Sequence, residues 1–154
     1  MALTFTVPND YGNVAAVALG AIPFLAFAHG VITTGCRKRA GVQYPHAYAT
    51  PEQCAKNPDA HKFNCAQRAH ANYLENMPQT MISILVAGLT HPRLATVLGS
   101  TWVALRALYL AGYVYSGQKK GNGRLLGAPF WLVQGALWGL SVFGMGFPGY
   151  DFYN

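Results

Sequence analysis

Four long apolar stretches limit what this chain can fold into. They cover residues 11–35, 66–89, 93–115 and 125–146, and each is long enough to cross a bilayer, since about 20 helical residues span its hydrocarbon core. Of the 154 residues, 52% are hydrophobic and only 10% are charged, a balance unusual for a protein surrounded by water. The sequence therefore predicts an all-α integral membrane protein, a four-helix bundle in which residues 1–154 form a single domain.

The segments between these stretches predict the connections and the orientation. Residues 36–65 read as one long polar loop and residues 116–124 as a short basic one, whereas residues 90–92 allow only a tight turn, with Pro92 in the first turn of the next helix. Lysines and arginines gather in the first and third loops and are absent from both termini. By the positive-inside rule, these two loops face the cytoplasm. The net charge of +6 is then a sign of topology and of attraction for anions, and nucleic acid is not expected as a partner.

The cysteines and histidines predict neither a disulfide nor a metal site. Cys36, Cys54 and Cys65 all lie at or within the predicted cytoplasmic loop, where reducing conditions disfavour disulfides. The five histidines are scattered, and no two are three or four residues apart. We therefore expect no metal ion.

Two of the predicted helices carry polar and aromatic side chains at the same spacing of four, three and four residues. In the second stretch these are Arg68, Asn72, Glu75 and Gln79, and in the third they are Trp102, Arg106, Tyr109 and Tyr113. Helix geometry places each set within one narrow stripe. Because a tight turn joins the two helices, the stripes can meet across the hairpin.

Charged side chains at this depth need partners, since an unpaired arginine or glutamate in mid-bilayer costs at least about 2.5 kcal/mol. Glu75 can pair with Arg68 or with Arg106. One interpretation is a buried ion-pair network that only fixes helix register. The other is an anion-binding site, because two arginines face one carboxylate and Arg124 follows at the predicted cytoplasmic mouth. The pattern alone leaves both open.

Residues 63–78, FNCAQRAHANYLENMP, resemble the second-helix signature of the membrane-associated proteins in eicosanoid and glutathione metabolism. Tyr11-Gly12, Val42-Gln43-Tyr44-Pro45 and His91-Pro92-Arg93 are similar to the pattern of the third-type microsomal glutathione S-transferases, the members that the chain resembles most. One position departs from the family, which often has an aromatic residue where this chain has Asn76.

The resemblance implies a homotrimer that binds glutathione, as co-substrate, between neighbouring subunits near the cytoplasmic side. Most of the residues expected to bind it come from the two stripes, namely Arg68, Asn72, Glu75, Arg106, Tyr109 and Tyr113. Arg37 and Lys38 match basic residues that reach the ligand from the end of the first helix. His70 points almost opposite to Arg68, so it can serve only the site of a neighbouring subunit.

The resemblance also implies a catalytic residue, Arg124, in the stretch Arg124-Leu125-Leu126-Gly127-Ala128-Pro129. A cysteine thiol has a pKa of about 8.5, and a nearby guanidinium stabilises the thiolate, which is the nucleophile. The implied activity is that of a glutathione transferase or glutathione-dependent lipid peroxidase, with leukotriene-C-synthase-like activity possible. The second substrate is then a hydrophobic, lipid-like electrophile or hydroperoxide that enters from the membrane.

Two other functions stay open. The chain could be a non-catalytic accessory or structural subunit of a larger membrane complex, or a small transporter or channel whose pathway is lined by the Arg–Glu stripe. The resemblance implies the endoplasmic reticulum or nuclear envelope as the location, with the mitochondrial outer membrane as the alternative.

Overall fold

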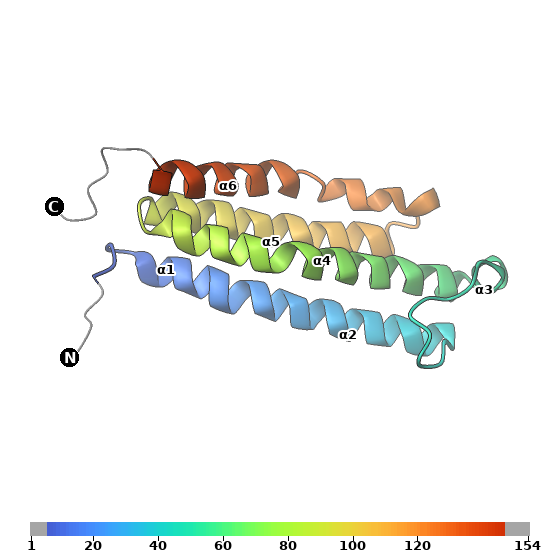
Figure 1. The fold of residues 1–154 in the computed structure, drawn as a ribbon. Coiled ribbons are helices and arrows are strands. Elements are labelled where there is room, and N and C mark those ends of the chain that lie inside the picture. The colour runs from blue at the N-terminus through green and yellow to red at the C-terminus, as the bar shows by residue number, and fades with distance from the viewer. Residues whose placement is uncertain (1–5, 147–154) are drawn as a thin grey trace.

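The computed structural model describes residues 6–146, and within them it contains helices and connecting loops but no β-strand. The first long helix is continuous from Tyr11 to Ala40 and comprises α1 (Tyr11–Ala15), a π-helical segment η1 (Ala16–Ala21) and α2 (Ile22–Ala40). The other elements are α3 (Pro51–Lys56), α4 (Pro58–Gly88), α5 (Pro92–Tyr115), the 3-10 segment η2 (Lys119–Leu126) and α6 (Phe130–Gly146). The long helices lie side by side and roughly parallel to one axis (Figure 1).

The helix ends follow local signals, and they shorten the long loop predicted between residues 36 and 65. The first helix continues to Ala40 because the first left-handed residue is Gly41, whose φ is 68°. α4 begins at Pro58, where the Asn57 side chain accepts a hydrogen bond from the Asp59 N–H at 2.9 Å. At the other end of the chain, the last helix starts at Phe130 rather than near residue 125, because residues 119–126 form the tighter η2.

Three helical segments have the length and hydropathy of membrane spans: Tyr11–Ala40, Pro92–Tyr115 and Gly121–Gly144. α4 is longer than any span requires, but it is too polar to be counted with them, because it carries side chains such as Arg68, Asn72 and Glu75. The structure packs α4 against α2, α5 and α6 (Figure 1). The prediction of spans is thus confirmed for three segments, and a fourth crossing by α4 stays a prediction.

Large apolar side chains lie on the outside of these helices as well as inside. Phe24 is 72% exposed and Leu132 is 79% exposed. The interior holds a cluster that includes Ile22, Tyr73 and Trp102, each fully buried. An apolar outer surface on long apolar helices fits lipid as the surrounding solvent.

Candidate functional site

The polar stripe of α4 forms the first part of the candidate site. Arg68 and Glu75 make an ion pair with 3.0 Å between Nη1 and Oε1, and both side chains are about half exposed. Asn72 lies between them in sequence, and its amide nitrogen donates to the other Glu75 oxygen at 3.5 Å. Glu75 therefore pairs with Arg68, one of its two predicted partners, and the pair is open to an approaching ligand.

Arg106 lies behind this surface in the interior of the bundle and is fully buried. Its Nη1 donates to the Asn72 side-chain oxygen at 2.8 Å, so it reaches the α4 stripe through Asn72 rather than through Glu75. Its Nε and Nη2 have no hydrogen-bond partner among the described residues. Four aromatic rings surround its guanidinium at 4.2–5.6 Å, those of Tyr73, Trp102, Tyr109 and Phe130. The ring faces attract this buried cation and partly replace water.

Tyr109 and Tyr113 continue the site along α5 toward η2. Their rings meet edge to face with centroids 5.7 Å apart, and the Arg124 guanidinium lies 5.5 Å from the centroid of the Tyr113 ring. Arg124 also donates from Nη1 to the Gly121 carbonyl oxygen at 3.0 Å. An unbroken series of ion-pair, hydrogen-bond and ring contacts, which we call the contact chain, thus joins seven residues: Arg68, Glu75, Asn72, Arg106, Tyr109, Tyr113 and Arg124.

Glycines allow η2, and with it Arg124, to lie close against α5. A Cβ on Gly123 would lie 2.0 Å from the Gly112 carbonyl oxygen, and a Cβ on Gly127 would lie 2.3 Å from the Leu105 carbonyl oxygen. Only glycine permits so close an approach of two backbones. Gly121 has a φ of 67°, and a Cβ at this position would collide with the Tyr113 ring. The position of Arg124 therefore depends on the absence of side chains at these sites.

A second polar network lies deeper and connects α4 and α5 to α6. Gln134, fully buried, donates to Asn76 Oδ1 at 3.1 Å and accepts from the Trp102 indole N–H at 3.0 Å. Gln79, the last member of the predicted stripe, is exposed and donates to Asn76 as well, at 3.0 Å. Asn76, the residue that departs from the family pattern, is thus buried and joins α4 to α6 through Gln134. Gln134 makes the interhelical hydrogen bonds expected of a polar residue within a helix bundle.

Arg37 lies apart from the contact chain and fastens the loop that follows α2. It is 8% exposed, donates from Nη1 to the His46 carbonyl oxygen at 2.6 Å, and lies over the rings of Tyr44 and Phe63 at 4.4 and 4.5 Å. The guanidinium of Arg37 is therefore engaged by residues of its own chain. Its predicted contact with a ligand stays a prediction.

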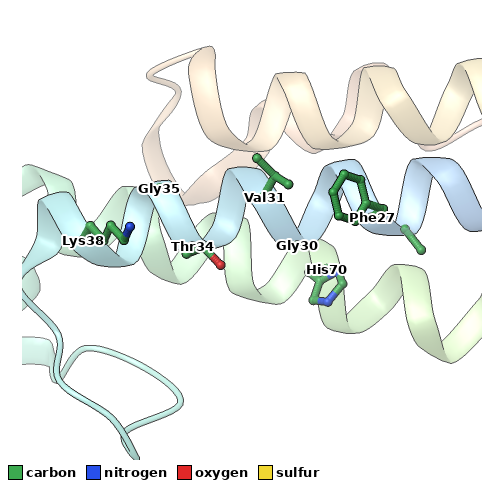
Figure 2. Close-up of a pocket in the computed structure, with 8 residues that line it drawn as sticks. Phe27, Gly30, Val31, Thr34, Gly35, Lys38 and His70 are labelled. Carbon is green, nitrogen blue, oxygen red and sulfur yellow. The ribbon is translucent and has the colours of Figure 1, made fainter.

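Lys38 and His70 lie together on another face of the molecule. They line a groove of about 620 Å³ that runs along α2, and Figure 2 shows His70 of α4 beside the part of α2 that carries Thr34 and Phe27. The lining of this groove includes no member of the contact chain. The predicted site residues therefore form two separate groups, with Arg37 in neither.

Some of the residues that build the site have no recognisable signal in the sequence. Tyr73 and Phe130 complete the ring of aromatic side chains around Arg106. Tyr73 belongs to the motif of residues 63–78, but it falls outside the spacing of four, three and four residues. Phe130 comes from α6, and nothing in the sequence indicates that it meets Arg106.

No metal centre accompanies these residues in the part of the chain that the structure describes. Within residues 6–146, no three histidine, cysteine or acidic side chains lie together as metal ligands. The three cysteines are free thiols. The members of the contact chain carry guanidinium, carboxylate, amide and phenol groups.

Comparison with models of known protein families shows the family to which the chain belongs. The model of the MAPEG family matches residues 15–143, which include α2, α4, α5, η2 and nearly all of α6. This family includes glutathione transferases and enzymes of eicosanoid synthesis. Since the match covers most of the chain, and three of its helical segments are apolar enough to cross a bilayer, this protein is an integral membrane member of the MAPEG family.

Proposed function

We propose that this protein is a membrane glutathione transferase or glutathione-dependent lipid peroxidase, similar to the third-type microsomal glutathione S-transferases. The observation that carries the proposal is the contact chain, which links an open ion pair on α4 to a cation on η2. A register-fixing ion pair would need only Arg68 and Glu75. The additional arginines and phenols give the series the donors and the positive charge that an anionic peptide requires.

The ion pair of Arg68 and Glu75 suits a ligand that carries both charges. Glutathione has an ammonium group and two carboxylates, so its ammonium can bind Glu75 while a carboxylate binds Arg68. Asn72 offers an amide to the peptide backbone, and Tyr109 and Tyr113 line the path toward Arg124. Arg106, being buried, acts through Asn72 by fixing the orientation of its amide.

Arg124 activates the thiol in this proposal. Its guanidinium stabilises the glutathione thiolate electrostatically, so the thiol proton passes to solvent at neutral pH. The sulfur then forms a bond to a carbon of a hydrophobic electrophile while the bond from that carbon to an epoxide oxygen or other leaving group breaks, and the departing anion takes a proton from solvent. In the peroxidase reaction the sulfur attacks a hydroperoxide oxygen, the O–O bond breaks, and the alkoxide takes a proton from solvent and leaves as an alcohol. A second glutathione then reduces the resulting sulfenic acid, which gives glutathione disulfide and water. The apolar outer surface of the helices lets such a substrate approach from the bilayer.

The second group, Lys38 and His70, fits the homotrimer that the family implies. We infer that the groove along α2 faces a neighbouring subunit, so that these side chains approach the contact chain of that subunit rather than their own. In the same arrangement, α4 crosses the membrane as a fourth span with its polar stripe turned toward protein. The first and third loops face the cytoplasm, and the endoplasmic reticulum or nuclear envelope is the proposed membrane, with the mitochondrial outer membrane as the alternative.

The test is glutathione binding to the detergent-purified trimer by calorimetry, followed by thiolate formation in the same sample, measured as ultraviolet absorbance. We expect the wild type to bind and to show the thiolate, and Arg124→Ala to bind but lose the thiolate signal. Arg93→Ala is the matched control, because Arg93 pairs with Asp10 and its side chain is 89% exposed.

Two results would contradict the proposal. A thiolate signal that persists in Arg124→Ala would remove the catalytic role of this residue. No binding at all by a folded trimer would favour the accessory-subunit interpretation and direct the search toward protein partners.

A further inference from the structure

The loop between α2 and α3 is fastened to α4 at a defined place. The Asn64 side chain accepts from the Ala49 N–H at 2.8 Å and donates to the Ala49 carbonyl oxygen at 2.9 Å, and its amide nitrogen also donates to Cys54 Sγ of α3 at 3.3 Å. Ala49 is buried. Thr50, the next residue, caps α3 by exchanging two hydrogen bonds with Gln53. The backbone at residues 49 and 50 is therefore held on both sides.

This fastening places Tyr48 at the edge of the contact chain. Asn64 and Arg68 are four residues apart on α4, so they lie one above the other on the same face of the helix. Tyr48 directly precedes the residue that Asn64 holds, and its phenol lies within electrostatic reach of the Arg68 guanidinium. Tyr109 of α5 also lies within such reach. One phenol from the loop and one from α5 are therefore in the electrostatic neighbourhood of Arg68.

Tyr48 is available to a ligand, since it is 43% exposed although its neighbour Ala49 is buried. A bound carboxylate has two oxygens and about four acceptor positions, more than one guanidinium fills. Arg68 also shares its guanidinium with Glu75. A neutral hydroxyl beside Arg68 can donate the additional hydrogen bond without adding charge.

We propose that Tyr48 is a glutathione-binding residue whose hydroxyl donates to the carboxylate held by Arg68. This inference rests on the proposed function and adds a contact from the loop. The loop then forms one wall of the site, and Asn64 and Arg37 are the positioning residues that hold this wall.

The test is Tyr48→Phe, which removes one oxygen atom and keeps the ring. We expect glutathione binding by calorimetry to weaken about tenfold, the size of one lost hydrogen bond to a charged group. The KM for glutathione should rise similarly while kcat at saturation stays unchanged, because Tyr48 contacts a carboxylate of glutathione and Arg124 acts on the thiol. Tyr44→Phe is the matched control, because Tyr44 is in the same loop, also lies beside an arginine and is 74% exposed.

Glutathione monoesters identify the contact directly. Esterification of the carboxylate that binds Tyr48 should make wild type and Tyr48→Phe bind equally, and the ester at the other carboxylate should preserve the tenfold difference. Equal binding of unmodified glutathione by wild type and Tyr48→Phe would overturn the inference while leaving the proposed function intact. A wild type that does not bind glutathione would instead overturn the proposed function, and the role of Tyr48 with it.

Discussion

The close approach between α5 and Gly127, the residue that follows η2, gives the sharpest prediction, the effect of Gly127→Ala. The added Cβ would lie 2.3 Å from the Leu105 carbonyl oxygen and 2.3 Å from the Tyr109 backbone nitrogen, whereas ordinary contacts of a Cβ begin near 3.4 Å. Both neighbours are backbone atoms, so no side chain can rotate away. The two segments must separate by about 1 Å, and overpacking of this kind costs about 1–3 kcal/mol.

This displacement moves Arg124, which lies three residues before Gly127. A misplacement of about 1 Å can lower a catalytic rate about a hundredfold. The added Cβ does not touch the α4 residues that we propose to bind glutathione, so the dissociation constant of glutathione should change by less than about threefold. We therefore expect Gly127→Ala to separate binding from turnover, with kcat measured using glutathione and a model electrophile and binding measured by calorimetry.

Gly135→Ala is the matched control, because a Cβ on Gly135 meets nothing within 4 Å. It should leave turnover, binding and the thermal midpoint in detergent unchanged. Wild-type turnover in Gly127→Ala would refute the argument that the glycine contacts position Arg124. A parallel loss of binding and turnover in a folded trimer would refute the separation of roles between α4 and η2.

Three further perturbations test other parts of the structure. Glu75→Gln keeps the shape of the side chain but removes its charge, and we expect glutathione binding by calorimetry to weaken about fivefold to tenfold, a value reduced for the half-exposed position. Gln134→Leu removes the hydrogen-bond partner of the buried Trp102 indole N–H. This change should lower the free energy of unfolding by about 1–3 kcal/mol and lower the thermal midpoint. In alkylation followed by peptide mass spectrometry, Cys54 should react before the other two cysteines, because it is partly exposed and they are buried.

Each of these predictions has a control or a contradicting result. Glu52→Gln, at an exposed position of α3, should bind glutathione like the wild type, and unchanged binding in Glu75→Gln would exclude its role. Gln118→Leu, also exposed, should leave the thermal midpoint unchanged, and an equal midpoint in Gln134→Leu would contradict the importance of the buried network. Alkylation of Cys65 at the same rate as Cys54 would show that the end of the bundle opens in solution.

Much of the fold could be predicted from the sequence because its signals are local. Apolar length predicts a span, and the spacing of four, three and four residues predicts that Arg68, Asn72 and Glu75 share one face of a helix. Three spans and the α4 network of hydrogen bonds agree with these expectations. The pairing of Glu75 with Arg68 follows from helix periodicity, since both residues are on α4.

Only the tertiary structure decided how separate segments meet. Arg106 has the same spacing signal as Tyr109, but packing against α4 and α6 buries it and directs it to Asn72. The folding of the first loop turns Arg37 toward His46 and fastens Ala49, the neighbour of Tyr48, to Asn64 of α4.

The position of Arg124 was decided in the same way, by glycines that let η2 lie against α5. By itself, the sequence determined the apolar spans and the polar stripes of single helices, because helix periodicity is a property of neighbouring residues. Which stripe meets which loop depends on side-chain volume and backbone approach between distant residues, and these become defined only when the helices pack.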